Sequence, residues 1–404
     1  MHKTQTGISV RRIAWLFCAT YLISYLTRIN FSTIISEIEL STGFPREQLS
    51  MSLTGLFVCY GIGQVISGKC GDRFSPKKMI SVGLSVSTLV NLIIPICTNP
   101  WQMLAVWCVN GFAQSFMWPP MVRLMVALLT QEEYISVNVK VAWGSSFGTV
   151  IMYLIAPALI TLLGWRSVFL FSACCGLIGI VLWQKLAYDI PPEPAVVKTE
   201  HASGKKARIF SPVMLAIMAA IILHGMLRDG VTTWVPTLIT ETYQISNVIS
   251  ILTGVVLPLF SILCYQVASI LYKKYFTNPV LCSAVIFGTG AAAALVLYLC
   301  NGLSPIVSAL LAALLTGCMH GVNWVLIGMI PAFFRKTGSI STVSGALNAC
   351  TYIGSALSTY GVAVLSQQVG WQGTILIWLL IAAGGAVICT LNTKPWNKFQ
   401  SKLL

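Results

Sequence analysis

Long apolar runs alternate with short polar connections along the chain. Twelve windows of about 20 or more mostly apolar residues can be drawn, the length that an α-helix needs to cross a bilayer. They cover residues 13–36, 50–70, 79–98, 101–128, 136–163, 166–187, 212–239, 247–272, 278–300, 304–334, 338–365 and 371–392. The pattern predicts an all-α membrane protein with 12 transmembrane helices.

One polar segment interrupts this pattern. Residues 188–211 are rich in proline and then in charge, which is typical of a linker on the cytosolic side. The sequence therefore predicts an N-terminal six-helix bundle at 1–187, the linker at 188–211 and a C-terminal six-helix bundle at 212–404.

Composition supports a membrane protein and gives its orientation. Of 404 residues 56% are hydrophobic and only 9% are charged, whereas a soluble domain carries about 25% charged residues. With the N-terminus in the cytosol, Arg28 and Arg228 lie inside spans, Arg46 and Arg166 lie outside, and the other Lys and Arg lie on the inner side. This asymmetry follows the positive-inside rule. It predicts cytosolic N- and C-termini in a multi-pass plasma (bacterial inner) membrane protein, and it explains the net charge of +14 without nucleic acid.

The two halves resemble copies of each other. NGFAQSFMW at 110–118 matches TGCMHGVNW at 316–324, and Gly148 matches Gly354 at the same offset of 206 (354 − 148). Arg28 and Arg228 differ by 200 positions. A parallel repeat of six plus six spans is the plan of major-facilitator transporters, whose substrate site lies near the midplane between the halves. The sequence thus predicts two pseudo-symmetric bundles with the major facilitator fold.

The short loop after the second span predicts a gating element. It reads GKCGDRFSPKK from Gly68 to Lys78 and resembles the G-x-x-x-D-R-x-x-x-[RK] loop motif of that superfamily. Asp72 and Arg73 are the charged pair of the motif. We expect Asp72 to lie near helix ends and to pair with a cation, with Arg123 as a plausible partner.

The two arginines inside spans are the candidate anion site. Each lies about 22–24 Å from the inner end of its helix, at about 1.5 Å per residue. An arginine within a membrane span normally faces a cavity or a pathway. The guanidinium fork suits phosphate or carboxylate, and two of them match a dianion better than a monoanion. Asp229 follows Arg228 directly, but neighbouring helix positions are about 100° apart, so we expect its partner on another helix.

Polar residues on the same faces extend this site. Tyr21, Tyr25, Arg28 and Ser32 follow helical spacing, as do His224, Arg228 and Thr232. The offset of 206 aligns His320 with Gln114, which places both toward a central position. The predicted substrate-binding residues are Arg28, Arg228, Tyr21, Tyr25, Tyr352, His224, Gln64, Ser145, His320 and Asn348.

Several of these residues also allow other roles. Each tyrosine could be packing, and each histidine could be a satisfied core residue. Asp229, His224 and His320 are candidates for proton coupling. No two histidines share a metal-ligand spacing, so we expect no metal and no cofactor, and the 13 cysteines read as reduced packing residues.

The combined segments resemble the organophosphate:phosphate antiporters, which include the bacterial glycerol-3-phosphate and hexose-6-phosphate transporters. The resemblance rests on YLISYLTRIN (21–30), FMWPPMVR (116–123), LRDGVTTWVPT (227–237) and GALNACTYIGS (345–355), and it runs over nearly the whole chain. It implies that Tyr21, Tyr25, Arg28, Arg228 and Tyr352 contact the substrate.

Three positions depart from that family pattern. Ile29 stands where a second cation usually follows the first arginine, Gln64 replaces a lysine, and Ser145 replaces a histidine. A smaller or less charged anion is therefore possible. YGIGQVISGKCGDRFSPKK (60–78) and TRINFS (27–32) are also similar to the anion:cation symporters.

The sequence predicts a secondary transporter of a small organic anion. The first hypothesis is exchange of a phosphorylated metabolite for inorganic phosphate by alternating access, in a protein that functions as a monomer within the lipid bilayer. The alternatives are a proton-coupled carboxylate symporter and a transporter-like anion receptor. No nucleotide loop or catalytic constellation is present in the sequence, so an enzyme is not expected.

Overall fold

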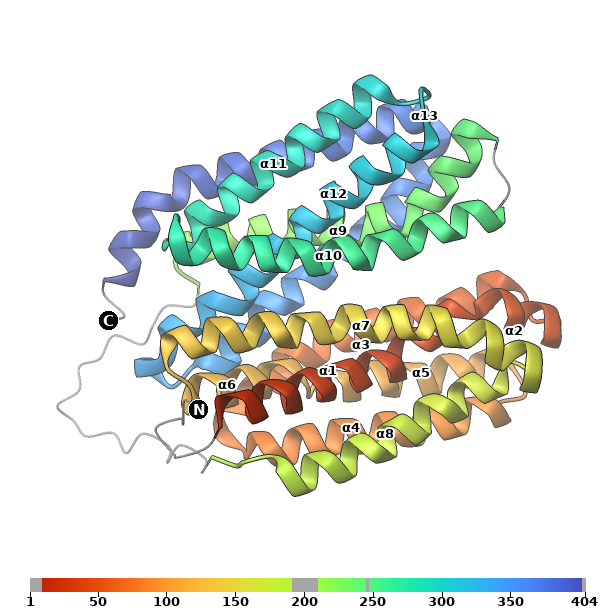
Figure 1. Cartoon of the computed structure of the whole chain (residues 1–404), viewed down its shortest axis with the longest axis horizontal. Coiled ribbons are helices and arrows are strands. Elements are labelled where there is room, and N and C mark those ends of the chain that lie inside the picture. Colours follow the sequence, from red (N-terminus) through yellow and green to blue (C-terminus); the bar gives the residue numbers. More distant parts are fainter. Residues whose placement is uncertain (1–8, 191–209, 245–246, 402–404) are drawn as a thin grey trace. The chain divides into compact units, whose positions relative to one another are not determined.

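The computed structural model describes residues 9–190, 210–244 and 247–401, and nearly all of them are helical (Figure 1). The helices before the predicted linker are α1 (Val10–Thr33), α2 (Ile35–Thr42), α3 (Arg46–Arg73), α4 (Pro76–Ile93), η1 (Ile94–Ile96), α5 (Pro100–Gln114), α6 (Trp118–Leu128), α7 (Gln131–Leu163) and α8 (Arg166–Leu186). Those after it are α9 (Pro212–Tyr243), α10 (Asn247–Lys274), α11 (Pro279–Cys300), α12 (Pro305–Asn323), η2 (Trp324–Met329), η3 (Ile330–Thr337) and α13 (Ile340–Gln400).

Contacts between residues divide the chain into two compact units. The first comprises Met1–Gly204 with Gly338–Ala349, and the second comprises Lys205–Thr337 with Cys350–Leu404. The start of α13 thus belongs to the first unit, although it follows the second in sequence. Residues 191–209 of the predicted linker lie outside the described residues, so its boundaries stay a prediction.

All twelve apolar windows fall on helices. Nine stretches of the described chain are long and apolar enough to cross a membrane. The other three windows are 13–36, 101–128 and 338–365. The second of these is broken between α5 and α6, and the third shares the long helix α13 with the last window. The backbone of α13 breaks at Gly370, where φ is +67°, between the two windows.

Matching caps begin equivalent helices in the two halves. Ser75–Pro76 starts α4 and Asn278–Pro279 starts α11, and in each the cap side chain accepts a hydrogen bond from a backbone N–H of the first turn. Asn99–Pro100 and Ser304–Pro305 do the same for α5 and α12. A polar cap followed by proline satisfies or removes donors that a helix start leaves unpaired. The repeat therefore extends to the points where helices begin.

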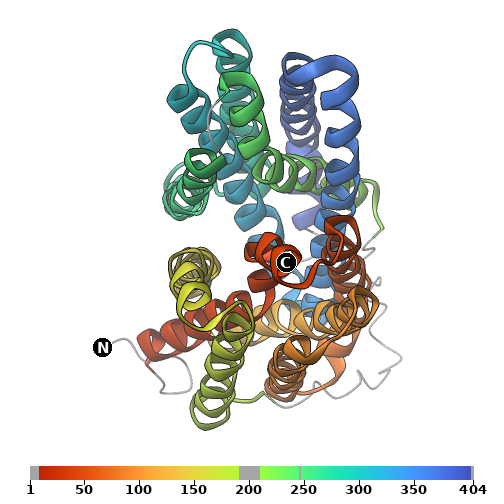
Figure 2. The ribbon, with the colours of Figure 1, turned by 90° about the vertical axis from the view of Figure 1, so that its right-hand side faces the viewer.

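In the first unit α1 lies at the centre of the packing. It contacts α7 and α8 extensively and α4 and α5 less so, while α3 packs on α5 and α4 packs on α8. Figure 2 shows these helices nearly end-on as a bundle. The rings of Phe31, Trp107 and Phe169 pack in tilted and edge-on arrangements, with centroids 5.1–6.0 Å apart, within the hydrophobic core of this unit.

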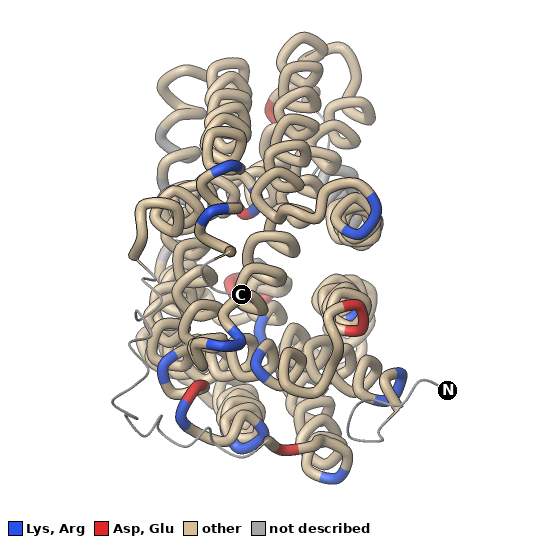
Figure 3. Tube along the Cα trace, turned by 90° about the vertical axis from the view of Figure 1, so that its left-hand side faces the viewer, with Lys and Arg blue, Asp and Glu red and all other residues tan. Residues whose placement is uncertain are grey.

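In the second unit α12 takes the central place, with α9, α10 and α11 against it. Charged residues are few in the helix interiors, where Lys140 of α7 and the neighbours Arg228 and Asp229 of α9 are exceptions, and Figure 3 shows Lys and Arg mainly at helix ends and in connections. This is the distribution expected where apolar helix surfaces face lipid.

Glycines set the closest helix approaches, and they do so symmetrically. A Cβ on Gly148 of α7 would lie 2.7 Å from the Leu22 carbonyl oxygen of α1. A Cβ on Gly354 of α13 would clash with the Ile222 carbonyl oxygen of α9. The glycine pair has offset 206 and the carbonyl pair has offset 200, as in the sequence repeat. Small residues allow such close crossings. They place α1 directly against α7 in the first unit and α9 directly against α13 in the second.

We predict that Gly148→Ala and Gly354→Ala each destabilise the protein. The added methyl group has no room beside a backbone carbonyl, and overpacking of this kind costs about 1–3 kcal/mol. Thermal unfolding of the detergent-solubilised protein should therefore begin at lower temperature.

The control is Gly288→Ala in α11, where an added Cβ meets nothing within 4 Å. Alanine favours a helix over glycine by about 0.5–1 kcal/mol, so this variant should not lose stability. Equal stability of all three variants would contradict the proposed glycine contacts.

Candidate functional site

Helix α1 has one buried face and one partly exposed face, and Arg28 lies on the partly exposed face. Tyr21, Tyr25 and Arg28 are partly exposed on one side, and their spacing is the one that the sequence predicts. The guanidinium carbon of Arg28 lies 4.3 Å from the ring centroid of Tyr25 and 5.1 Å from that of Tyr60 on α3. Aromatic faces attract a cation. Tyr60 is thus a contact of Arg28 that the sequence reasoning missed.

The opposite face of α1 is held by a buried polar network. The Asn30 side chain donates to Asn91 Oδ1 (2.6 Å) and to Ser172 Oγ (2.9 Å). The carbonyl of Thr27 accepts from Asn91 Nδ2 and Asn110 Nδ2, both at 2.9 Å. These polar residues are at most 3% exposed, and buried polar networks fix geometry when their members are satisfied. Three helices, α4, α5 and α8, therefore anchor the segment of α1 that carries Arg28.

Gln114 belongs to this network. Its side-chain amide donates to Ser24 O, Thr27 Oγ1 and Ser87 Oγ at 2.7–3.1 Å. The expectation that Gln114 takes a central position like that of His320 is therefore wrong. The repeat aligned the two positions, but the packing of α5 against α1 and α4 turns Gln114 into the bundle core.

Gln64 and Ser145 are buried within the first unit. Gln64 is 0% exposed and donates from Nε2 to the Ser115 carbonyl at the break between α5 and α6 (3.4 Å). Ser145 donates to the Ala142 carbonyl of its own helix (2.7 Å). Both have local partners, and their contact with substrate stays a prediction.

Arg228 of α9 has a different environment from Arg28. Its Nε lies 2.7 Å from Asp229 Oδ1 and its Nη2 lies 2.8 Å from Asp229 Oδ2. Its Nη1 donates to Asn323 Oδ1 of α12 (3.2 Å). The expectation that the two neighbours do not face each other is wrong in this case, because the long arginine side chain folds sideways onto the carboxylate. Asp229 also accepts from Ser355 of α13, so the expected partner on another helix is present as well.

The two candidate histidines belong to the second unit: His224 lies on α9, the helix of the ion pair, and His320 lies on α12, the helix of Asn323. His224 is 0% exposed, with Nδ1 2.8 Å from the Ile221 carbonyl oxygen. Its Nε2 has no hydrogen-bond partner among the described residues. His320 Nδ1 lies 2.9 Å from the hydroxyl of Tyr265. Each therefore has a local role, and substrate or proton contacts stay predictions.

Asn348 and Tyr352 lie one turn apart on α13, and each is 7% exposed. The division into units separates them, with Asn348 in the first and Tyr352 in the second. Their place in the substrate site stays a prediction.

The Asp72 carboxylate lies at helix ends, as expected, and its pairing with Arg123 stays a prediction. The Asp72 carboxylate accepts from the backbone N–H groups of Ser341 (2.8 Å) and Thr342 (2.9 Å) at the start of α13. Arg123 Nη1 donates to the carbonyls of Gly71 (2.6 Å) and Phe74 (3.2 Å) at the end of α3. Helix starts present unpaired N–H groups and helix ends present unpaired carbonyls. Each charge therefore binds the terminus of opposite polarity.

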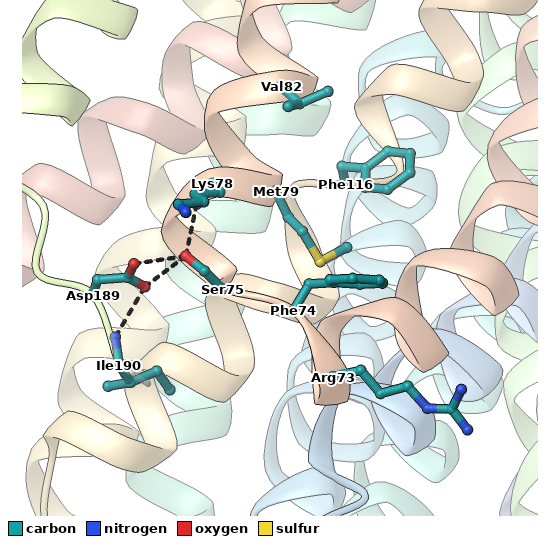
Figure 4. Close-up of a pocket in the computed structure, with 9 residues that line it drawn as sticks. All are labelled: Arg73, Phe74, Ser75, Lys78, Met79, Val82, Phe116, Asp189 and Ile190. Carbon is teal, nitrogen blue, oxygen red and sulfur yellow. Dashed lines mark hydrogen bonds between the residues drawn. The ribbon is translucent and has the colours of Figure 1, made fainter. Parts of the chain in front are cut away.

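Arg73 lies in a separate pocket of about 510 Å³ at the same end of the first unit. Figure 4 shows Arg73 and Lys78 at this pocket with Phe74, Met79 and Phe116. Asp189 closes one side and accepts from Ser75 Oγ at 2.7 and 2.8 Å. None of the predicted substrate-binding residues lines the pocket. Across the described residues, no three His, Cys, Asp or Glu side chains gather in a way that could hold a metal ion.

Comparison with known proteins identifies the class of molecule. The sequence pattern of the Major Facilitator Superfamily matches residues 17–359. The membrane sensor protein UhpC of Escherichia coli is 21% identical, covering 92% of this chain and 89% of that protein. A probable hexose phosphate transport protein of Chlamydia trachomatis is 23% identical over 97% and 92%, and the glycerol-3-phosphate transporter of Bacillus subtilis is 23% identical over 92% and 89%.

A solved structure agrees in fold. The transporter FucP in its outward conformation matches with a TM-score of 0.76 at 12% identity, covering 94% of this chain and 98% of FucP. These comparisons confirm the predicted family resemblance, the all-helical major facilitator fold and the multi-pass membrane character. The protein is related to transporters and not to enzymes. The chain belongs to the Major Facilitator Superfamily.

Proposed function

We propose that the protein exchanges a small phosphorylated metabolite for inorganic phosphate by alternating access. The observation that carries this proposal is one arginine in each half at matching positions, Arg28 on α1 and Arg228 on α9. Relatives that match over most of their length are described as hexose phosphate and glycerol-3-phosphate transport proteins.

In this proposal both arginines bind the anion. The rings of Tyr25 and Tyr60 lie 4.3 and 5.1 Å from the Arg28 guanidinium carbon and help to orient this cation. Tyr21, Tyr352, His224, Gln64, Ser145, His320 and Asn348 are the further predicted contacts to the organic moiety. In this proposal the empty carrier changes state slowly, because the bound anion contributes to the balance of charge in a low-dielectric site.

The proposal places the protein in a bacterial inner membrane as a monomer with both termini in the cytosol. The distribution of Lys and Arg along the sequence supports this orientation. No cofactor takes part, and the lipid bilayer is the surrounding solvent.

Two other functions have a specific observation in their favour. A proton-coupled carboxylate symporter is supported by Asp229, an acidic group within a membrane helix and paired with Arg228. An anion receptor is supported by the relative described as a membrane sensor protein. A receptor would bind the anion without moving it across the bilayer.

The first test is phosphate exchange in proteoliposomes loaded with unlabelled phosphate. Wild type should take up labelled phosphate, and Arg28→Ala or Arg228→Ala should reduce uptake at least about thirtyfold, since truncating a buried charged partner costs about 2–5 kcal/mol. The control is Arg166→Ala, an arginine exposed at the start of α8 that donates to the Pro95 carbonyl (2.9 Å). Normal exchange by folded Arg28 and Arg228 variants would exclude this site.

The coupling ion gives a second test. Exchange of phosphate should need phosphate inside the vesicles and should persist when a protonophore collapses the proton gradient. Uptake that stops with the protonophore and needs no internal phosphate would instead support the symporter. Binding of the anion in the absence of any flux would support the receptor.

Asp72, Arg73 and Arg123 are proposed to act in gating rather than in binding. Asp72→Asn removes the charge that caps α13, a contribution of about 0.3–1 kcal/mol at a helix start. The maximal exchange rate should therefore fall while the half-saturating phosphate concentration changes little. Asp189→Asn is the matched control, because Asp189 is also bound at a helix start, beside Ser75, but contacts no part of α13. Equal effects of the two variants would contradict a specific gating role.

A further inference from the structure

The pocket at the end of α3 combines charged and apolar side chains. Its volume is about 510 Å³, and all the residues that line it belong to the first unit. Arg73 and Lys78 are its cations, and Phe74, Phe116 and Val82 are among its apolar residues. In Figure 4, Phe74 lies between Arg73 and Phe116, and Val82 lies at the end farthest from Arg73. The pocket therefore changes from charged to apolar along its length.

This pocket lies where two candidate membrane spans meet. One span is Gln48–Arg73 and the next is Pro76–Ile96. The ends of such spans lie at the level of the lipid headgroups. Val82 follows Pro76 by six residues (82 − 76), which is about 9 Å further along the helix and towards the apolar interior. The pocket thus extends from the headgroup level towards the acyl chains.

The two lysines of the loop motif have different surroundings. Lys77 Nζ donates to the carbonyls of Gln184 (3.0 Å) and Ala187 (2.8 Å), and so binds the end of α8. Lys78 and Arg73 are exposed, and within the part of the chain that the structure describes their charged groups form no hydrogen bond or ion pair. Both cations are therefore accessible to a ligand.

The charges of the pocket favour an anion. Asp189 is the acidic residue of its lining, and its carboxylate already accepts from Ser75 Oγ (2.7 and 2.8 Å) and from the Ile190 N–H (3.0 Å). Two cations and one carboxylate leave a formal charge of +1 (2 − 1). Arginine and lysine both bind phosphate groups, and a phosphodiester carries a single negative charge. The pocket and a phosphodiester are therefore complementary in charge.

We propose that this pocket binds an anionic phospholipid, with its phosphodiester at Arg73 and Lys78 and an acyl chain along Phe74, Phe116 and Val82. Phe74 and Val82 are 59% and 56% exposed, so their apolar surfaces are available to the chain. Basic pockets between transmembrane helices bind anionic headgroups by the same chemistry. None of these residues is a predicted substrate contact, so the inference does not rest on the proposed function.

The test compares phosphatidylglycerol with phosphatidylcholine of the same acyl chains, which has no net charge. Native mass spectrometry measures the binding of each lipid to the purified full chain in a neutral detergent. Wild type should bind phosphatidylglycerol at least about tenfold more tightly, and the double variant Arg73→Gln/Lys78→Gln should lose this preference. The matched control is Lys273→Gln/Lys274→Gln, which removes two exposed cations from the end of α10, the equivalent helix of the second half. This control should keep the preference.

Inorganic phosphate distinguishes a lipid site from a site for a free anion. It has the charged group of the lipid but no acyl chains, so a large excess should not displace phosphatidylglycerol. Displacement by phosphate would overturn the proposal, and so would equal binding of the two lipids by wild type. Equal losses in the two double variants would show attraction by net charge alone, which also overturns it. If Arg73→Gln does not fold, Lys78→Gln alone should weaken phosphatidylglycerol but not phosphatidylcholine, and an unchanged affinity would overturn the proposal.

Discussion

A charge inside an apolar helix must be given a partner, and this requirement explains the local structure around both arginines. The two halves meet it in different ways. Arg28 lies against the rings of Tyr25 and Tyr60, which attract the cation without cancelling its charge. Arg228 is bound by the Asp229 carboxylate, which does cancel it. The two arginines of the pseudo-symmetric repeat therefore lie in unlike surroundings, aromatic rings in the first half and a carboxylate in the second, although the sequence pattern is a repeat.

The helix packing that positions these side chains is symmetric between the two halves, although the contacts of the two arginines are not. Gly148 and Gly354 bring α7 and α13 against the backbones of α1 and α9 at equivalent carbonyls, those of Leu22 and Ile222. Close packing tolerates few substitutions, because a carbonyl cannot move without disturbing its helix. Polar contacts are more easily exchanged. In the first half, Gln114 joins the polar network around Asn30 and Asn91 that holds α1. In the second half the corresponding residue is His320, which hydrogen-bonds to Tyr265.

The sequence was sufficient to predict the helices and the fold, because these depend on hydropathy and spacing, while the role of the two arginines stays a prediction. It was not sufficient for contacts that depend on which helix faces which. Asn91 and Asn110 look like isolated polar interruptions until α4 and α5 pack on α1. Tyr60 lies 32 residues from Arg28 (60 − 28), and no spacing rule connects them. The sequence analysis excluded the Arg228–Asp229 pair because adjacent helix positions point in different directions. That angle describes only the Cβ directions, and a long flexible side chain can still fold onto its neighbour.

Helix α13 links features that the sequence treats separately. Its first turn is bound by Asp72 through Ser341 and Thr342, and the contacts of this turn assign it to the first unit. Further along, Ser355 donates to Asp229 and Gly354 packs on α9. The two regions are separated by 13 residues of the same helix (355 − 342), with no backbone break between them, since the break of α13 comes at Gly370. Helix α13 thus provides hydrogen-bond partners for both the loop motif and the Arg228–Asp229 pair, although the loop motif belongs to the first unit and the ion pair to the second.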